Sequence, residues 1–150
     1  MDSLEALRHK LEEQAVEYEI LTHKYTARTA QEGAAMLGIE LGQTAPALIV
    51  KSPDVYLALI VSGERGRVNL EQAASLIGAA SLRMASPREA MEITGFEVGS
   101  IPLVLQLPCI LDRKLLSHEY IYGGAGKPGT TLKLRPHALE TLNEVIAYLD

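Results

Sequence analysis

The sequence predicts an α/β (α+β) fold in which short helices surround a mixed sheet. Short β-rich runs and short capped helices alternate along the chain without the regular order of a doubly wound protein. Two of these runs, 45–51 and 55–61, are separated only by Ser52-Pro53-Asp54, which is typical of a hairpin turn and therefore of antiparallel pairing. Several predicted helices stop at a glycine, the residue that most readily takes a left-handed helix end.

Composition limits the protein to a few classes. With 150 residues, of which 47% are apolar and 22% charged, the chain is expected to form a single domain, 1–150, with an aliphatic core. The single cysteine excludes an internal disulfide and is typical of a reducing compartment. No apolar run has the length of a membrane span and the start has no signal-peptide pattern, so we expect a cytoplasmic protein with no membrane partner. The net charge of −5 argues against a broad nucleic-acid-binding surface but is compatible with one local patch.

The first half of the chain begins with a predicted helix over 3–16. Asp2 and Glu5 have capping-box spacing, and leucines recur on one face of that helix. A short strand is expected over 18–21. Thr29 and Glu32 form a second capping box that opens a helix over 30–37. The hairpin of 45–51 and 55–61 follows.

Helices alternate with strands in the second half as well. Asn69 is the expected cap of a helix over 70–77, and a strand is expected over 81–84. Ser86 and Glu89 form a third capping box, which opens a helix over 87–94 with proline at its first position. The last helix is predicted over 136–149, where Leu139, Leu142, Ile146 and Leu149 recur at helical spacing.

The stretch from Gly95 to Asp112 is the centre of the predicted site. It starts as a loop that contains Gly95, Gly99 and Pro102, and it continues as the apolar run 103–107, which predicts a buried strand. A loop fixed to a central strand is a common place for ligand-binding backbone groups. Strands over 120–122 and 130–134 are expected on either side of a second glycine-rich loop, 123–129.

Several kinds of chemistry are not indicated. No metal or other cofactor is expected, because no metal-ligand spacing connects the histidines and the cysteine, which are His9, His23, His118, His137 and Cys109. Cys109 lies in an apolar run, where a free cysteine usually behaves as a small hydrophobe. The loop 123–129 opens no helix and matches neither the P-loop nor the dinucleotide-binding motif.

The order of motifs is more specific than any one of them. It comprises Thr29-Ala30-Gln31-Glu32-Gly33-Ala34-Ala35-Met36-Leu37-Gly38, then Gly42-Gln43 and the hairpin, Ala85-Ser86-Pro87-Arg88-Glu89-Ala90, Gly99-Ser100-Ile101-Pro102, the apolar stretch ending at Asp112, and Gly124-Ala125-Gly126-Lys127-Pro128-Gly129. From about Tyr18 to Leu142 this series resembles the YbaK/prolyl-tRNA synthetase-associated editing domain family. The resemblance implies a curved mixed sheet surrounded by helices, and hydrolysis of the ester of tRNA that carries the wrong amino acid.

The resemblance also implies a substrate site near the two glycine loops. The loop of Gly99, Ser100, Ile101 and Pro102 would embrace the aminoacyl group and the terminal adenosine at the 3′ end of the tRNA. The opposite wall would contain Gly124 and Gly126, with Pro46 on the floor between the loops; Thr29 and Lys127 complete the expected substrate-binding set. No catalytic residue is assigned.

The chain departs from the family pattern at two positions. The lysine that the family places after Gly-Gln corresponds to Pro46 here, and serine is common in the family where Gly124 stands. Lys51 is a poor substitute for this lysine. It lies five residues after Pro46, and an odd offset along a strand puts its side chain on the opposite face of the sheet. Lys127 is the better candidate for the missing positive charge.

Three functions follow from these observations. The first is an aminoacyl-tRNA deacylase-like protein that edits mischarged tRNA in trans. The second is a non-catalytic binder of aminoacyl-tRNA, or of a small aminoacyl or nucleotide ligand, in the same pocket. The third is a domain that associates with an aminoacyl-tRNA synthetase.

Overall fold

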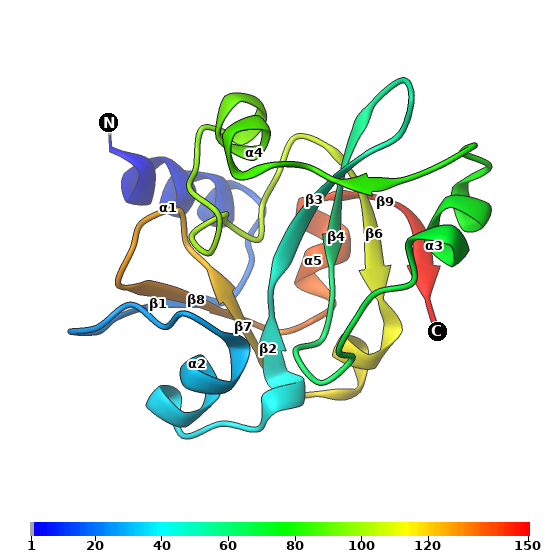
Figure 1. Cartoon of the computed structure of the whole chain (residues 1–150). Coiled ribbons are helices and arrows are strands. Elements are labelled where there is room, and N and C mark those ends of the chain that lie inside the picture. The colour runs from blue at the N-terminus through cyan, green and yellow to red at the C-terminus, as the bar shows by residue number, and fades with distance from the viewer. Residues whose placement is uncertain (1) are drawn as a thin grey trace.

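The computed structural model describes residues 2–150, which form two β-sheets with short helices packed around them (Figure 1). The helices of this part of the chain are α1 (Ser3–Glu13), α2 (Ala30–Leu37), α3 (Leu70–Ile77), α4 (Pro87–Thr94) and α5 (Ala138–Leu142), with 3₁₀ turns at Leu41–Gln43 and Arg113–Ser117. The strands are β1 (Tyr18–Thr22), β2 (Thr44–Ala45), β3 (Ala47–Lys51), β4 (Tyr56–Ile60), β5 (Arg83–Met84), β6 (Pro108–Asp112), β7 (Ile121–Gly124), β8 (Thr130–Leu134) and β9 (Glu144–Leu149).

Both sheets mix parallel and antiparallel pairs, as predicted. The four-stranded sheet has the order β1-β8-β7-β2, in which only the β2–β7 pair is parallel. The five-stranded sheet has the order β5-β3-β4-β6-β9, with β6 parallel to both of its neighbours. The predicted hairpin is confirmed by the antiparallel pair β3 and β4, and Ser52 Oγ accepts hydrogen bonds from the N–H groups of Asp54 and Val55 in its turn.

Pro46 marks the point where the chain passes from one sheet to the other. Ala45 pairs with Gly123 in the four-stranded sheet, whereas Ala47 pairs with Ile60 in the five-stranded sheet. Proline has no N–H to donate to a strand ladder, so it suits this junction. Its carbonyl accepts a hydrogen bond of 3.1 Å from Val61 N–H, which holds the junction against β4.

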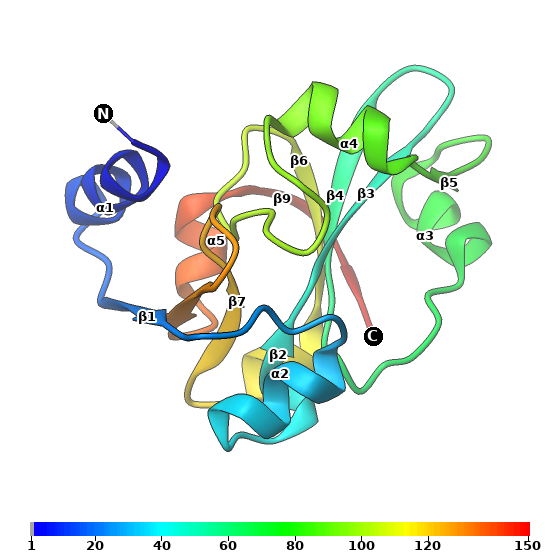
Figure 2. The ribbon, with the colours of Figure 1, turned by 60° about the vertical axis from the view of Figure 1, so that its left-hand side comes forward.

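Helices cover the five-stranded sheet on both faces (Figure 2). Along β4 the side chains alternate: Leu57 and Leu59 pack with the alanines of α3, and Ala58 packs with Ala90 of α4. Both faces of β4 are therefore buried. A further cluster joins the two sheets and includes Leu7 and Leu11 of α1, so α1 closes the core from the side.

The predicted helix caps are present. The side chains at the starts of α1 to α4 each accept a hydrogen bond from the N–H three residues on; these caps are Asp2, Thr29, Asn69 and Ser86. Glycines in the left-handed conformation end α2, α3 and α4, and these are Gly38, Gly78 and Gly95. The prediction for α1 was too long, because the helix ends at Glu13 and Ala15 has a φ of 54°, outside the helical range.

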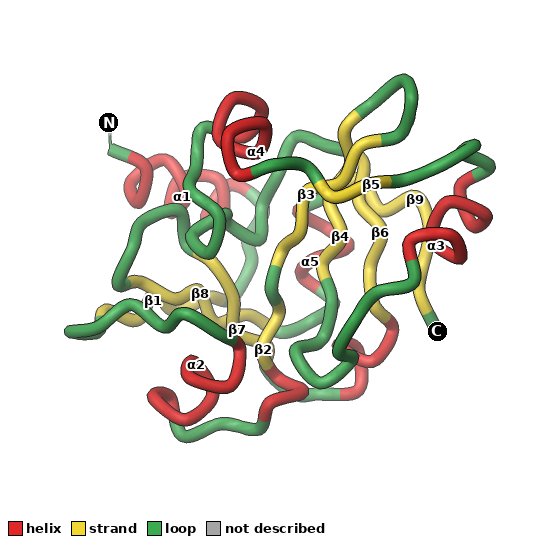
Figure 3. Tube along the Cα trace, in the orientation of Figure 1, coloured by secondary structure: helices red, strands yellow, loops and turns green. Residues whose placement is uncertain are grey.

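The helix predicted over 136–149 is wrong. The chain forms the short helix α5 and then the strand β9, which pairs with β6 (Figure 3). The leucine spacing favoured a helix, but the segment 144–149 carries the β-branched and aromatic residues that pack well in a sheet. Asn143 separates the two elements: its backbone is extended, and its side chain bonds to the chain at Leu103 and Leu105 instead of continuing the helix.

The strand predicted over 103–107 is also wrong, although the run is buried except at Gln106 and partly at Leu107. The strand β6 begins only at Pro108. The Leu103 N–H donates to Gly124 O, while Leu103 O and Leu105 N–H bond to the Asn143 side chain. One backbone hydrogen bond to β7 and the side-chain hydrogen bonds of Asn143 thus take the place of a strand ladder here.

In the part of the chain that the structure describes, no helix is both long and apolar enough to cross a membrane.

Candidate functional site

A pocket of about 200 Å³ opens between the loop that precedes α2, the strands β7 and β8, and the two glycine loops. The residues that line it are His23, Thr26, Ala27, Arg28, Thr29, Ala30, Gly33, Met36, Leu37, Thr44, Ala45, Pro46, Gly99, Ser100, Tyr122, Gly123, Gly124, Lys127, Gly129, Thr130 and Thr131. They come from segments far apart in the sequence, and the sheet junction at Pro46 is among them. The pocket is therefore a product of the tertiary fold.

Most of the predicted substrate-binding residues line this one pocket. They are Thr29, Pro46, Gly99, Ser100, Gly124 and Lys127. Three others do not line it. Ile101 is buried in the core, Pro102 borders a separate hollow beside α1, and Gly126 packs against Phe96.

The two glycine loops are hydrogen-bonded to each other. Gly126 N–H donates to Ser100 O at 2.9 Å, and Leu103 N–H donates to Gly124 O at 3.1 Å. The expectation that the loops face each other across a cleft is corrected: they form one continuous wall of the pocket. Their backbones approach so closely that a Cβ at Gly124 would lie 2.0 Å from Ile101 O. A serine side chain at position 124 has no room in this structure.

The wall also presents bare backbone to the pocket. Gly99 has a φ of 92°, and no heavy atom lies within 4 Å of the place where its Cβ would be. Because a left-handed φ strains any other residue, glycine is needed here. A ligand in the pocket can therefore approach the main chain at Gly99 directly.

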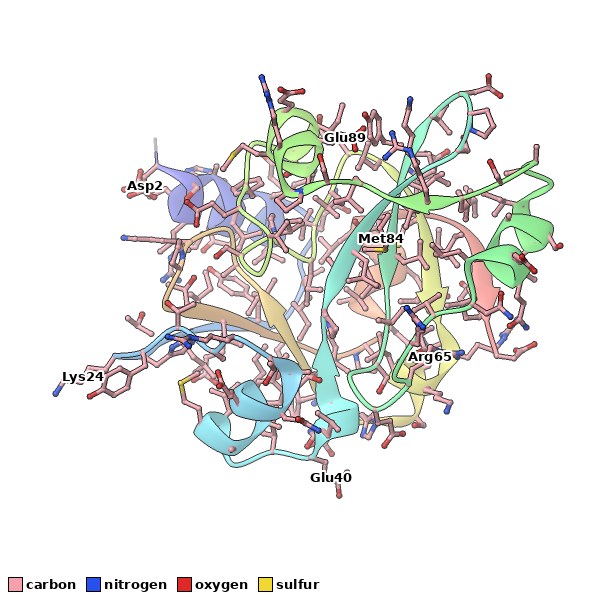
Figure 4. The ribbon with its side chains drawn as sticks, viewed as in Figure 1. Asp2, Lys24, Glu40, Arg65, Met84 and Glu89 are labelled. Carbon is pink, nitrogen blue, oxygen red and sulfur yellow. The ribbon has the colours of Figure 1, made fainter. Side chains whose placement is uncertain are left out.

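Positive side chains gather at the pocket although the whole chain is acidic. Arg28 and Lys127 line the pocket, and both are exposed. Lys24 extends from the same loop as Arg28 and away from the body of the protein (Figure 4). Lys51 lies at the far end of the hairpin, 5.5 Å from the centre of the Tyr56 ring, and does not line the pocket. The structure thus brings Lys127 and Pro46 to one pocket and leaves Lys51 outside it.

Sequence reasoning missed several pocket residues, among them Arg28, His23 and Thr131. His23 Nδ1 lies 2.6 Å from Tyr25 O, and His23 Nε2 lies 3.0 Å from Thr131 Oγ1. Side chains alternate along β8, so Thr131 points to the face of the sheet away from the buried Leu132 and Leu134. This alternation is a weak signal that Thr131 does not belong to the core. Nothing in the sequence links residues 23 and 131, because only the pairing of β1 with β8 makes them neighbours.

Asp112, the last residue of the central stretch, has a structural position outside the pocket. Its fully buried carboxylate accepts hydrogen bonds from the Arg65 guanidinium at 2.7 and 2.9 Å and from the N–H groups of Ser62 and Lys114. Burial by itself raises the pKa of Asp112, but these hydrogen bonds outweigh it, and the pKa lies below its ordinary value. The carboxylate therefore ties the loop after β4 to β6.

Cys109 offers no nucleophile. Its side chain is buried in β6, and burial raises the pKa of the thiol to about 12. The thiolate is the reactive form, so Cys109 is unreactive at neutral pH. Within residues 2–150, no three His, Cys, Asp or Glu side chains lie close enough together to hold a metal ion.

Comparison with known proteins gives consistent matches. A family model described as the aminoacyl-tRNA editing domain matches residues 25–142. A proline–tRNA ligase from Caldicellulosiruptor bescii is 30% identical over 107 residues, which is 71% of this chain but 18% of the ligase. The chain thus spans less than a fifth of the length of that relative. Bacillus subtilis YwhH, an uncharacterized protein, is 22% identical over 99% of this chain and 96% of its own length.

Solved structures agree on the fold. A candidate trans-editing enzyme for prolyl-tRNA synthetase superposes with a TM-score of 0.85 at 29% identity, and the match covers 98% of this chain and 95% of that one. The similarity therefore extends over the whole arrangement of the two sheets and their helices, including the part that forms the pocket.

Proposed function

Since the chain belongs to the aminoacyl-tRNA editing domain family, we propose that it is an aminoacyl-tRNA deacylase-like protein that edits mischarged tRNA in trans. The observation that carries this proposal is the pocket, where the exposed backbone of Gly99, the two positive side chains Arg28 and Lys127 and a small cavity meet. As an editor of charged tRNA the protein would act in the cytoplasm, with the 3′ end of the tRNA as its direct partner.

The pocket suits an ester that is already labile. An aminoacyl ester beside a free ribose hydroxyl needs mainly to be positioned and to have its developing negative charge stabilised. The backbone at Gly99 and Gly124 can approach the aminoacyl group, and Lys127 and Arg28 can meet the phosphate next to the terminal ribose. This division of roles explains why glycine and basic residues occur together around one cavity.

The size of the pocket supports selection by exclusion. A cavity of about 200 Å³, lined in part by the small or apolar residues Ala27, Ala30 and Met36, would favour a small aminoacyl group over a large one. Excluding a bulkier side chain is easier than preferring a smaller one, and this sieving is how editing sites complement synthetases.

Pro46 favours a second candidate, a non-catalytic binder that uses the same pocket. Proline puts no cation where the family pattern has lysine, and it has no N–H to donate. Such a protein would hold the charged 3′ end without hydrolysing it. Association with an aminoacyl-tRNA synthetase is compatible with either function.

A deacylation screen over a panel of mischarged tRNAs tests the proposal. Release of free amino acid that depends on the protein supports the deacylase. Binding of charged tRNA with protection of its ester supports the binder. If neither release nor binding is found with any charged tRNA, both functions are excluded.

Two lysine variants test the position of the site. We expect Lys127→Ala to weaken charged-tRNA binding or turnover by roughly fivefold, because one phosphate contact of about 1 kcal/mol is lost. Lys51→Ala is the matched control and should behave as the parent, since Lys51 lies outside the pocket. Equal loss in the control, or no loss in Lys127→Ala, contradicts the assignment.

Restoring the family lysine tests Pro46 directly. We expect Pro46→Lys to keep the fold, because the position is half-buried at a strand junction and faces the pocket, where a long side chain can extend. The deacylation rate should rise if that cation stabilises the developing charge. An unfolded variant, detected by circular dichroism, contradicts the first expectation, and an unchanged rate contradicts the second.

A further inference from the structure

The contacts of His23 select one tautomer of its neutral ring. A carbonyl oxygen only accepts hydrogen bonds, so the 2.6 Å contact with Tyr25 O places a proton on Nδ1. In the neutral ring Nε2 then has no proton and is an acceptor. The Thr131 hydroxyl, 3.0 Å away, therefore donates its proton to Nε2. The Tyr25 carbonyl, the His23 imidazole and the Thr131 hydroxyl are thus connected by two consecutive hydrogen bonds.

Both side chains belong to the wall of the pocket. His23 follows β1 directly, and its N–H donates to Gly129 O at 2.9 Å, so its backbone is fixed. Thr131 is the second residue of β8. Both are half-buried and line the cavity beside Gly124 and Lys127. A molecule bound in the pocket would therefore lie next to both side chains.

Other threonines of the pocket have different bonds. Thr44 donates its hydroxyl proton to Leu41 O at 2.7 Å, and Thr130 donates to Lys127 O at 2.6 Å. Backbone carbonyls cannot take up a proton, so these hydroxyls only fix loops. The Thr131 hydroxyl instead faces a base, which leaves its oxygen lone pairs free to accept a proton from a molecule in the pocket.

We propose that Thr131 and His23 form a proton relay for ester hydrolysis, an inference that rests on the deacylase function proposed above. The Thr131 oxygen accepts a hydrogen bond from the attacking water. As the water oxygen bonds to the ester carbonyl carbon, one water proton passes to Thr131 Oγ1 while the Thr131 proton passes to His23 Nε2. The tetrahedral intermediate then expels the ribose oxygen, which receives a proton back along the same path, and leaves the free amino acid.

The relay supplies a base in a pocket that lacks the family lysine. A base that orients and deprotonates water accelerates a reaction by about 10²–10⁴-fold. The arrangement has the order of a nucleophile–base–orienter triad, with a backbone carbonyl as the orienting group. Here the hydroxyl passes on a proton, and the attacking oxygen is that of water.

Substitutions that keep shape but remove proton transfer test the relay. Thr131→Val keeps the branched shape without the hydroxyl, and Thr131→Ser keeps the hydroxyl. His23→Gln keeps an acceptor that the Thr131 hydroxyl can reach but cannot take its proton. Thr141→Val and His9→Gln are the matched controls, because both residues are exposed and outside the pocket.

The rate is measured in single-turnover deacylation of the mischarged tRNA that the parent hydrolyses fastest. We expect Thr131→Val and His23→Gln to lower this rate about a hundredfold. Thr131→Ser should keep most of the rate, and the controls should match the parent. Affinity for 3′-amino-3′-deoxyadenosine carrying the same amino acid through an amide should be unchanged in all variants, which separates proton transfer from loss of the pocket.

The possible results distinguish failure of the proton relay from failure of the proposed deacylase function. If the parent is active and Thr131→Val or His23→Gln keeps its rate, the relay is wrong and the deacylase stands. Equal losses of rate and of analogue affinity show that the pair only shapes the pocket, and this also overturns the relay. A parent that hydrolyses no charged tRNA overturns both proposals.

Discussion

Loss of the Asn143 side chain is expected to lower the stability of the fold strongly. The side chain is buried between α5 and the irregular run after Pro102. The amide oxygen accepts from Leu105 N–H at 2.9 Å, and the amide nitrogen donates to Leu103 O at 2.8 Å and to Leu139 O at 3.1 Å. Asn143→Ala removes all three hydrogen bonds at once.

The magnitude follows from what remains unpaired. Leu103 and Leu105 are buried, so the freed carbonyl and N–H cannot turn to solvent. An unsatisfied buried group costs about 1–3 kcal/mol, and the two together predict a loss of about 4 kcal/mol in the free energy of unfolding. The Leu139 carbonyl keeps the Asn143 backbone N–H as a partner and adds little.

Urea denaturation followed by circular dichroism measures this loss. The matched control is Asn69→Ala, which removes one exposed cap of α3 and should cost about 1 kcal/mol. If Asn143→Ala costs no more than Asn69→Ala, the run at 103–105 is not held by the Asn143 amide and the reasoning is refuted. A changed slope of the unfolding curve would indicate that the substitution also alters the compactness of the native or denatured state, or breaks two-state unfolding.

Further predictions concern the buried ion pair and the pocket wall. Arg65→Met should cost about 3 kcal/mol at neutral pH, because it leaves the buried Asp112 carboxylate without its charged partner. The folded state lowers the pKa of Asp112, so its contribution is complete above about pH 4 and declines as the pH falls through the folded-state pKa. Urea titrations at several pH values should therefore show that the cost of Arg65→Met shrinks below about pH 4, and a constant cost contradicts the role of the carboxylate. Gly124→Ala should lower both the melting temperature and the deacylation rate, since the new Cβ must push the backbone at Ile101 away; a variant with parental stability and rate contradicts the close approach seen here.

The helix ends and the hairpin turn could be predicted from the sequence because the interactions that form them involve residues close together in the chain. Caps such as Ser86 with Glu89 and the left-handed glycine at Gly95 act within a few residues, so α4 begins and ends where the sequence predicts. The same holds for the turn at Ser52, which needs only its own hydroxyl and the next two N–H groups. Most of the residues that the family resemblance assigns to the site then line the pocket, although they are a minority of its lining residues.

Two segments were misread because their structure depends on distant partners. The segment 144–149 has helical leucine spacing but becomes β9, since β6 has an open edge that accepts a parallel strand. The run 103–107 looks like a strand, but Asn143 supplies its hydrogen bonds from a position about 40 residues later in the chain. The spacing of apolar residues in a short segment carries no information about the open edge of β6 or the amide of Asn143, which lie elsewhere in the chain.

By itself the sequence determined the fold class, the caps and the hairpin, and through the family resemblance it led us to expect the glycine loops and Lys127 at the site. Only the tertiary structure decided that the two glycine loops form a single wall, and that His23 meets Thr131. Caps and turns arise from contacts between near neighbours in the chain, whereas a pocket is made by side chains that strand pairing brings together. The pairing of β1 with β8, and the junction at Pro46, set the geometry of this site.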